Sequence, residues 1–190
     1  MKNKIGDLVI QIITVMIGVF LGFIVSSWSE NSKEQQQANQ LLATISSEVQ
    51  TNQSRIVNVI DYHKMLRDTT RYYLQQRELS QFKPTFFRGL NTLTLSNSAF
   101  ETGTQTGLIN NIPLEQLQAL NNVYTKQRAY ENFTNILLTG LMSMDFNMNP
   151  ESARKMLMFL SVSMTDIVIK EEQLLQSYQS AQEVMKANDD

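Results

Sequence analysis

The chain of 190 residues contains a single histidine, His63, and no cysteine. One imidazole excludes a metal site built on several histidines, and the missing cysteines exclude thiolate ligands and thiol nucleophiles. The sequence also contains no glycine-rich phosphate loop, no paired-carboxylate motif and no zinc signature. It therefore predicts a protein that is not an enzyme and has no catalytic, metal-binding or cofactor-binding residues. His63 falls on the apolar seam of a predicted helix, where we expect a hydrogen-bonded core or interface histidine.

Three basic residues of the same predicted helix share one face. Lys64, Arg67 and Arg71 stand at positions i, i+3 and i+7, which follow one another along a helix surface. They form a candidate anion-binding face for an acidic ligand or partner. Asp61 and Asp68 lie within reach on the same helix, so the alternative is a solvated face that is partly paired with itself.

Six of the ten methionines gather around a predicted turn at residues 149–150. They are Met142, Met144, Met148, Met156, Met158 and Met164. Methionine fills irregular gaps between helices, and it also forms adaptable surfaces for partner proteins. The first role makes these residues part of a helical core. The second makes Met142, Met144 and Met148 a candidate partner surface, which we expect to contact a membrane-embedded protein.

The composition narrows the classes of partner. A formal net charge of −2 and a pI near 5.5, with scattered basic residues, argue against nucleic-acid binding, which normally uses a basic face. Only 18% of the residues are charged, whereas 65 are Asn, Gln, Ser or Thr. A surface built mainly from amides and hydroxyls is compatible with packing against other proteins.

Residues 8–28 form the strongest single feature, an uncharged and mostly apolar run of 21 residues. As a helix this run measures about 31 Å at about 1.5 Å per residue, which matches a hydrocarbon core of about 30 Å. A cleaved signal peptide is the alternative, but its apolar region is usually about 7–15 residues long and ends at a small-residue cleavage site. A buried core helix is a second alternative, and nothing else in the chain is apolar enough to cover one. We therefore predict one membrane span.

The residues that flank the span predict its orientation. Lys2 and Lys4 precede it, whereas Lys33 is the only basic residue in the roughly twenty that follow. Basic residues favour the cytoplasmic side, so we expect a cytoplasmic N-terminus, a single pass through the inner (plasma) membrane and an extracytoplasmic, periplasmic C-terminal domain. Trp28 lies where an interfacial aromatic anchor belongs.

Small residues recur every four positions within the span. Thr14, Gly18, Gly22 and Ser26 share one helix face, and Gly18-x-x-x-Gly22 has the spacing of a membrane-helix dimerisation motif. Such a face lets a second helix approach closely. It is the candidate membrane-helix interface, while the alternative is that small residues are simply common in membrane helices.

Beyond the span, residues 29–40 are expected to form a solvated helical stalk. A 3,4 spacing of apolar residues begins at residue 42 and predicts an amphipathic helix. Nothing before residue 82 breaks a helix, so span, stalk and outer helix are expected to form one rod that ends at Pro84. The seam of this helix is Leu42, Ile45, Val49, Asn52, Ile56, Val59, His63, Leu66, Thr70 and Tyr73.

Residues 85–112 are the irregular part of the chain. We expect one or two short helices here, with Ser96 or Asn97 as an N-cap and Gly107 just past a helix end. A small strand at residues 92–95 is the alternative.

Two more long helices follow. Pro113 opens the second, which is expected to run to about residue 148. Asn149 caps the third, with a proline and an acidic residue behind it. The seam of the third helix is Ala153, Leu157, Leu160, Met164, Ile167, Glu171, Leu174, Tyr178, Ala181 and Met185.

These elements predict an all-α fold, in which an N-terminal transmembrane helix continues into a long helix packed in an antiparallel three- to four-helix extracytoplasmic bundle. The second long helix then returns toward the membrane and the third leaves it, which places the methionine-rich turn beside the bilayer. The expected divisions are residues 1–7 in the cytoplasm, 8–28 in the membrane, 29–40 as the stalk and 41–190 as the helical domain.

Short motifs at both ends of the span carry a family resemblance. They are Gly6-Asp7, Ile17-Gly18 and Trp28-Ser29-Glu30, with a weaker echo in Leu41-Leu42, Glu48, Ala99-Phe100-Glu101, Gly107 and residues 117–124. On these motifs the chain resembles a family of uncharacterised single-pass membrane proteins common in Bacteroidota. Family members more often carry Glu where Asp7 stands and a basic residue soon after the tryptophan, so the chain departs from the pattern at both places. The resemblance implies one membrane anchor and a helical outer domain, and it brings no activity or site.

The leading expectation is a non-enzymatic, membrane-anchored helical subunit or scaffold of a cell-envelope complex, which binds partners through the membrane helix and the bundle. The expected partners are the lipid bilayer and either other membrane protein subunits or further copies of the chain, with no nucleic acid. The alternative is an extracytoplasmic helical bundle that senses a small ligand near Lys64, Arg67 and Arg71.

Overall fold

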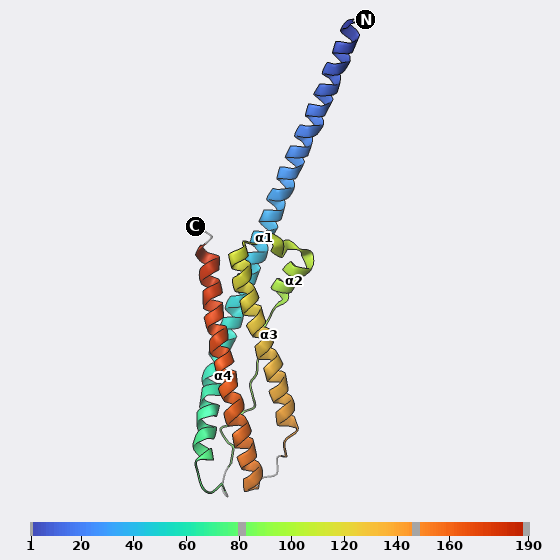
Figure 1. The fold of residues 1–190 in the computed structure, drawn as a ribbon. Coiled ribbons are helices and arrows are strands. Elements are labelled where there is room, and N and C mark those ends of the chain that lie inside the picture. Colours follow the sequence, from blue (N-terminus) through green and yellow to red (C-terminus); the bar gives the residue numbers. More distant parts are fainter. Residues whose placement is uncertain (1, 80–82, 146–148, 188–190) are drawn as a thin grey trace.

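A computed structural model describes residues 2–79, 83–145 and 149–187, with side chains from residue 6 onward. Four α-helices and one 3₁₀ helix follow one another: α1 (Lys2–Leu74), α2 (Ser98–Thr106), η1 (Leu108–Asn111), α3 (Leu114–Met142) and α4 (Pro150–Ala187). The predicted all-α bundle is confirmed (Figure 1). Within the described ranges no strand forms, so the alternative of a strand at residues 92–95 is wrong.

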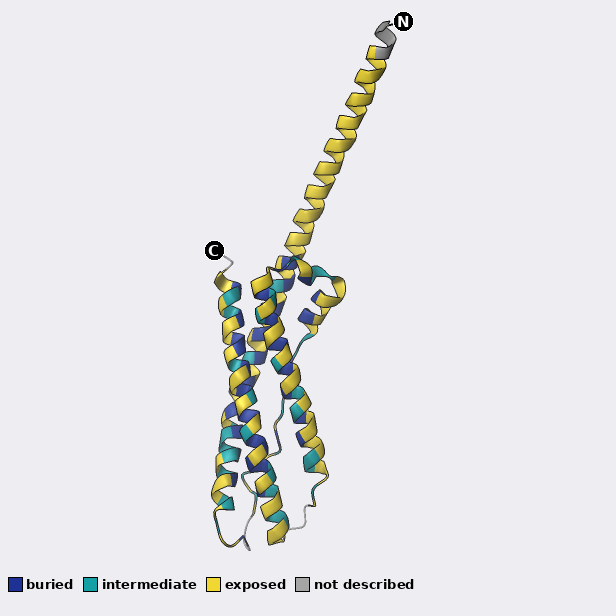
Figure 2. Ribbon diagram, viewed as in Figure 1, coloured by how far each residue is buried: buried dark blue, intermediate teal, exposed yellow. Residues whose placement is uncertain are grey.

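Helix α1 is unbroken over 73 residues, so it measures about 110 Å at about 1.5 Å per residue. The prediction of a single rod is confirmed. Its N-terminal part stands clear of the bundle, and every side chain from residue 6 to residue 37 is exposed (Figure 2). The first buried residue of the rod is Ala38. Among the described helices, α1 alone contains a segment long and apolar enough to cross a membrane.

Helix α4 packs against both α1 and α3 and runs antiparallel to each. Near the rod end of the bundle, Gln182 of α4 donates to Gln53 of α1 at 2.9 Å. At the far end, Arg154 near the start of α4 donates to the Leu74 carbonyl at 3.3 Å. These contacts place the start of α4 beside the end of α1, and Figure 1 shows the other end of α4 near the base of the rod.

Helix α3 runs parallel to α1, so the predicted directions of the second and third long helices are wrong. Near the base of the rod, Tyr124 of α3 donates to Glu48 of α1 at 2.6 Å, and α3 then runs away from the rod (Figure 1). The long connection at residues 75–97 explains the direction of α3. Its 23 residues, at about 3.3 Å each when extended, cover the roughly 55 Å from residue 74 back to residue 38. The chain therefore returns to the rod end before α3 begins.

Side chains of the helices hold the extended part of this connection, residues 88–96, by its main chain. Asn52 of α1 donates to the Ser96 carbonyl at 2.7 Å and accepts from the Ser96 N–H at 2.9 Å. The Tyr62 hydroxyl likewise forms two hydrogen bonds at the start of the segment: it donates to the Gly89 carbonyl at 2.7 Å and accepts from the Arg88 N–H at 2.8 Å. From α3, Glu131 accepts a main-chain N–H at 2.9 Å. Side chains thus satisfy several main-chain donors and acceptors of an extended segment that belongs to no sheet.

The predicted seams form the core. Eight successive seam positions of α1, from Ile45 to Thr70, are buried, and so are nine of α4, from Leu157 to Met185. Figure 2 shows the buried residues facing one another along the bundle axis. The periodicity therefore identified the buried faces of both helices correctly, including their polar members.

Tertiary contacts end α1 earlier than predicted. The helix ends at Leu74 rather than at Pro84. Arg154 donates to the carbonyls of Leu74 at 3.3 Å and Gln76 at 3.1 Å, and so satisfies groups that a helix end leaves without partners. Helix α3 likewise ends at residue 142 instead of about 148, and residues 146–148 lie outside the described ranges.

The signals at the ends of α2 and α4 are confirmed. Asn97 holds the N-cap position of α2, although its side chain donates to Glu101 and accepts no helix N–H, and Gly107 just past the helix end has a left-handed φ of 77°. Asn149 caps α4, because its Oδ1 accepts from the Ser152 N–H at 2.8 Å. A Cβ at Gly103 would lie 2.5 Å from the side chain of Leu41, so the absence of a side chain there lets α2 approach α1.

Candidate functional site

The most buried polar cluster joins the three long helices and the extended segment. His63 of α1 and Glu171 of α4 have no exposed side-chain surface, and Nδ1 of His63 lies 2.8 Å from Oε1 of Glu171. Nε2 of His63 lies 2.7 Å from the Leu90 carbonyl, an acceptor, so Nε2 carries a proton. Tyr130 of α3 donates to the same Glu171 oxygen at 3.3 Å. Both ring nitrogens are therefore occupied, and the expected hydrogen-bonded core histidine is confirmed.

Glu48 organises a second cluster at the start of α2. Its Oε1 accepts from the Tyr124 hydroxyl at 2.6 Å. Its Oε2 accepts from the Ser96 and Ser98 hydroxyls at 2.8 and 3.1 Å and from the Ala99 N–H at 3.0 Å. Burial raises the pKa of this carboxyl, but the hydrogen bonds, led by that from Ala99, outweigh burial and lower the pKa below its ordinary value. Burial, with help from the Glu48 carboxylate, raises the pKa of the Tyr124 hydroxyl, which stays protonated.

Hydrogen bonds within the bundle pair all but one of the carboxylate oxygens of the two clusters. Their donors and acceptors bond to one another, and Oε2 of Glu171 is the one carboxylate oxygen of the clusters without a partner among the described residues. Groups that are buried and paired in this way stabilise one packing arrangement, because separating any pair leaves an unsatisfied polar group in the core. The two clusters therefore hold the helices in one packing arrangement.

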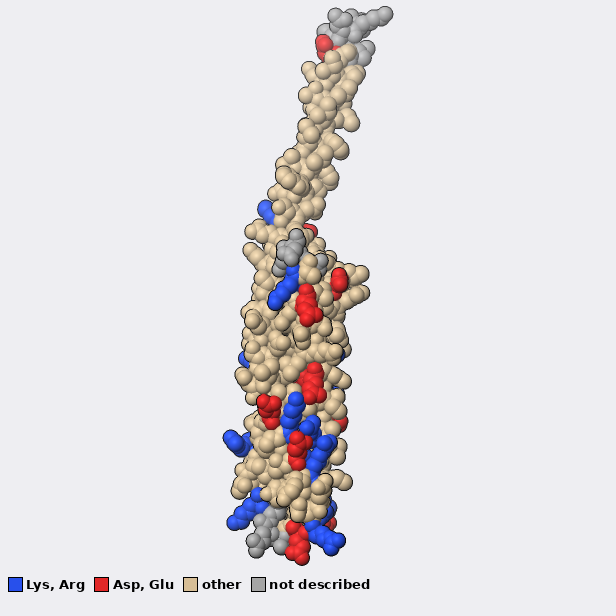
Figure 3. Space-filling view, turned by 90° about the vertical axis from the view of Figure 1, so that its left-hand side faces the viewer, with Lys and Arg blue, Asp and Glu red and all other residues tan. Residues whose placement is uncertain are grey.

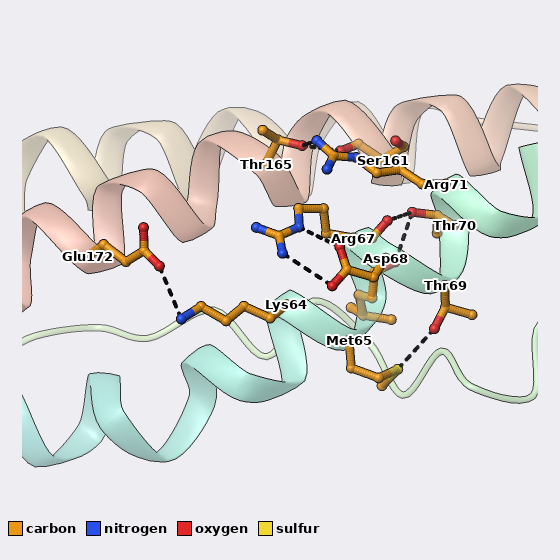
Figure 4. Close-up of polar contacts among 11 residues, drawn as sticks. Lys64, Met65, Arg67, Asp68, Thr69, Thr70, Arg71, Ser161, Thr165 and Glu172 are labelled. Carbon is orange, nitrogen blue, oxygen red and sulfur yellow. Dashed lines mark hydrogen bonds and ion pairs between the residues drawn. The ribbon is translucent and has the colours of Figure 1, made fainter.

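The basic residues Lys64, Arg67 and Arg71 lie along α1 beside α4, and each has a partner (Figure 4). The pairs are Lys64 with Glu172 at 3.0 Å, Arg67 with Asp68 at 2.8 and 3.2 Å, and Arg71 with Thr165 at 2.9 Å. The hydrogen bond from Arg67 lowers the pKa of the Asp68 carboxyl. An acidic ligand at this face would therefore have to displace carboxylates that already neutralise two of the three cations.

The methionine surface lies at the end of the bundle farthest from the rod. Met142 at the end of α3 is exposed, Met144 is half-buried and Met148 lies outside the described residues. Because α3 runs away from the rod, the turn between α3 and α4 lies opposite the apolar half of α1 (Figure 1). The helix direction on which the expected contact with a membrane-embedded partner depended is therefore wrong, and the contact itself stays a prediction without that support. Met164, by contrast, is fully buried and fills the core.

Thr14, Gly18, Gly22 and Ser26 form an uncovered strip on the exposed half of α1. Apart from the neighbouring residues and backbone of α1 itself, no described atom lies within 4 Å of a Cβ built at Gly18 or Gly22. The Thr14 hydroxyl donates back to the Ile10 carbonyl of its own helix at 2.9 Å. The strip is therefore smooth at its two glycines, and its Thr14 hydroxyl needs no external partner.

The periodicity placed one of the two acids that organise the buried clusters, Glu171, on a predicted seam, but it did not place Glu48 on one. Glu171 and His63 both stand on predicted seams, and an acid and an imidazole on facing seams are a usable signal for a buried pair. Glu48 carries no comparable signal, because three of its four partners, Ser96, Ser98 and Ala99, come from a part of the sequence with no regular pattern. Comparisons of the chain with models of protein families, with curated proteins and with solved structures found no match.

Proposed function

We propose that the chain is a non-enzymatic, membrane-anchored helical subunit of a cell-envelope complex. Residues 8–28 cross the inner membrane, the N-terminus lies in the cytoplasm and the bundle lies outside it, in the periplasm of a diderm bacterium such as a member of the Bacteroidota. One observation carries the proposal. The apolar, fully exposed segment and the core of the bundle belong to the same unbroken helix.

The continuity of α1 supports a scaffolding role. A helix without a break transmits position and orientation, whereas a flexible linker loses both. The predicted stalk, residues 29–40, is exposed throughout only from residue 29 to residue 37. This part measures about 14 Å at about 1.5 Å per residue, so it sets the bundle at a defined height above the bilayer. Figure 3 shows charged side chains mainly over the half of the bundle away from the rod, while the apolar part of the rod carries none.

The buried histidine supports a role without catalysis. A general base must reach a substrate, but the ring of His63 has no exposed surface and both of its nitrogens are bonded inside the core. The exposed strip at Gly18 and Gly22 supports partner binding in the membrane, because close helix approach there needs no rearrangement of the chain.

The absence of cysteine allows a direct test of topology. We expect a membrane-impermeant maleimide to label Ser180→Cys, an exposed position on α4, in intact spheroplasts. Asn3→Cys should react only after the membrane is permeabilised. Labelling of Asn3→Cys in intact spheroplasts, or protection of Ser180→Cys, would contradict the proposed orientation.

A second experiment tests association through the span. Native mass spectrometry of the full chain extracted in a neutral detergent should show an oligomer or a complex with other subunits. The double variant Gly18→Ile/Gly22→Ile should dissociate it, because the added side chains block close approach. The matched control, Ile13→Phe/Ile24→Phe, enlarges the opposite side of the same helix and should leave the assembly intact. A monomer free of partners in the unmodified chain would count against the proposal.

A further inference from the structure

A cleft of about 340 Å³ lies between α2 and α3, on the rod side of the bundle. Phe100 of α2 and Tyr124 of α3 stack in the cleft with ring centroids 4.2 Å apart and planes 21° apart. The two helices meet through these rings, and the remaining space between their facing sides stays open. The volume falls in the range of small-molecule sites, and the stacked rings form an apolar floor.

Acidic groups outnumber basic ones at this cleft. Glu101 of α2 and Glu131 of α3 line it, together with one cation, Arg128. Arg128 donates to the hydroxyl of Thr125 on its own helix at 3.1 Å, and among the described residues neither carboxylate forms an ion pair. The ionised Glu48 carboxylate adds negative potential behind the floor, since it accepts the Tyr124 hydroxyl.

Each cleft carboxylate keeps one oxygen for a ligand. Oε1 of Glu101 accepts from the side chain of Asn97 at 2.6 Å, and Oε1 of Glu131 accepts from the Leu95 N–H at 2.9 Å. These bonds hold both carboxylates in position. Among the described residues, no internal bond uses the Oε2 atoms.

Gln127 supplies an acceptor that lacks a donor. Its side chain lines the cleft, is only 2% exposed, and donates from Nε2 to the Tyr178 hydroxyl at 2.8 Å. Its Oε1 has no hydrogen-bond partner among the described residues. A buried carbonyl without a donor is costly in any fold. Because Oε1 is itself buried, the cleft wall has to open slightly for a ligand N–H to reach it, and the new hydrogen bond then removes that cost.

We propose that this cleft binds a small primary amine, with its ammonium group between Glu101, Glu131 and Gln127 and its methylene chain on the aromatic floor. An ammonium group donates three hydrogen bonds, and the cleft offers three acceptors, two of them charged. The stacked rings exclude water from the alkyl part of the ligand. This site is independent of the proposed anchoring role and goes beyond it.

Isothermal titration of the full chain in a neutral detergent, with putrescine (1,4-diaminobutane) as the probe, tests the proposal. We expect saturable binding. The variant Glu101→Gln/Glu131→Gln should bind at least tenfold more weakly, because it loses both charges while keeping the Oε1 acceptors that Asn97 and Leu95 use. The matched control, Glu115→Gln, removes an exposed carboxylate of α3 outside the cleft and should bind like the unmodified chain.

Gln127→Met separates ligand binding from a purely structural role. It should weaken putrescine binding at least threefold and leave the thermal midpoint unchanged or higher, because it removes the unpaired acceptor. Tetramethylammonium, which carries the charge but no N–H, should not bind. Absence of saturable putrescine binding, an equal loss in Glu115→Gln, or equal binding of tetramethylammonium would overturn the proposal. None of these results would bear on membrane topology or association.

Discussion

Replacing His63 alone should destabilise the bundle more than replacing His63 and Glu171 together. In His63→Leu, the Glu171 carboxylate stays in the core with only the Tyr130 hydroxyl, at 3.3 Å, as a partner. Leaving one member of a buried charged pair in this way costs about 3–5 kcal/mol. The expected loss is a large fraction of the stability of a typical domain, which is about 5–15 kcal/mol.

The double variant His63→Leu/Glu171→Met removes the carboxylate as well. The main group left without a partner is then the Leu90 carbonyl, which loses the Nε2 donor at 2.7 Å. An unsatisfied neutral group costs about 1–3 kcal/mol, so the double variant should be more stable than His63→Leu by about 2 kcal/mol.

Urea unfolding of the full chain in a neutral detergent, followed by circular dichroism at 222 nm, measures these differences. An exposed ion pair on the same two helices, Lys64 with Glu172 at 3.0 Å, provides the control, and Lys64→Met should cost less than about 1 kcal/mol. The reasoning is refuted if the losses of the single variants simply add in the double variant, or if His63→Leu costs no more than Lys64→Met.

Three further predictions concern single contacts. Because the pKa of Glu48 is lowered in the folded chain, its contribution to stability is present above its ordinary pKa of 4.5 and is lost as the pH falls through the folded value. The variant Glu48→Gln should therefore show a smaller change of the thermal midpoint with pH between about pH 6 and 3 than the unmodified chain. Gly103→Ala should cost about 1 kcal/mol, because crowding against Leu41 outweighs the gain in helix propensity, and the sign should reverse in a Leu41→Ala background. Arg154→Met should lower the free energy of unfolding by about 1–2 kcal/mol and speed amide hydrogen exchange in the last turn of α1, whereas unchanged exchange would show that this turn needs no cap.

The local elements of the fold follow from the sequence because helices obey local rules. Apolar residues spaced by three and four positions identify the buried face of α1 from Ile45 to Thr70, since the same spacing brings those side chains to one side. Asn149 marks the start of α4 because its side chain accepts a free N–H there, whereas Asn97 marks the start of α2 by position only, since Glu48 accepts the Ala99 N–H. The uncharged run at residues 8–28 is visible in the same way, because it depends only on length and composition.

The direction of α3, the end of α1 and the identity of the polar clusters depend on the tertiary structure. The periodicity of a seam shows which face of a helix is buried, but it does not show whether that helix runs parallel or antiparallel to its partner. The 23-residue connection at residues 75–97 is long enough to cross the whole bundle, so either direction is open to α3. That crossing reverses α3 and moves the methionine-rich turn away from the rod. It also brings the main chain of residues 88–96 to Asn52, Tyr62 and His63, contacts between positions far apart in the sequence that no local pattern encodes.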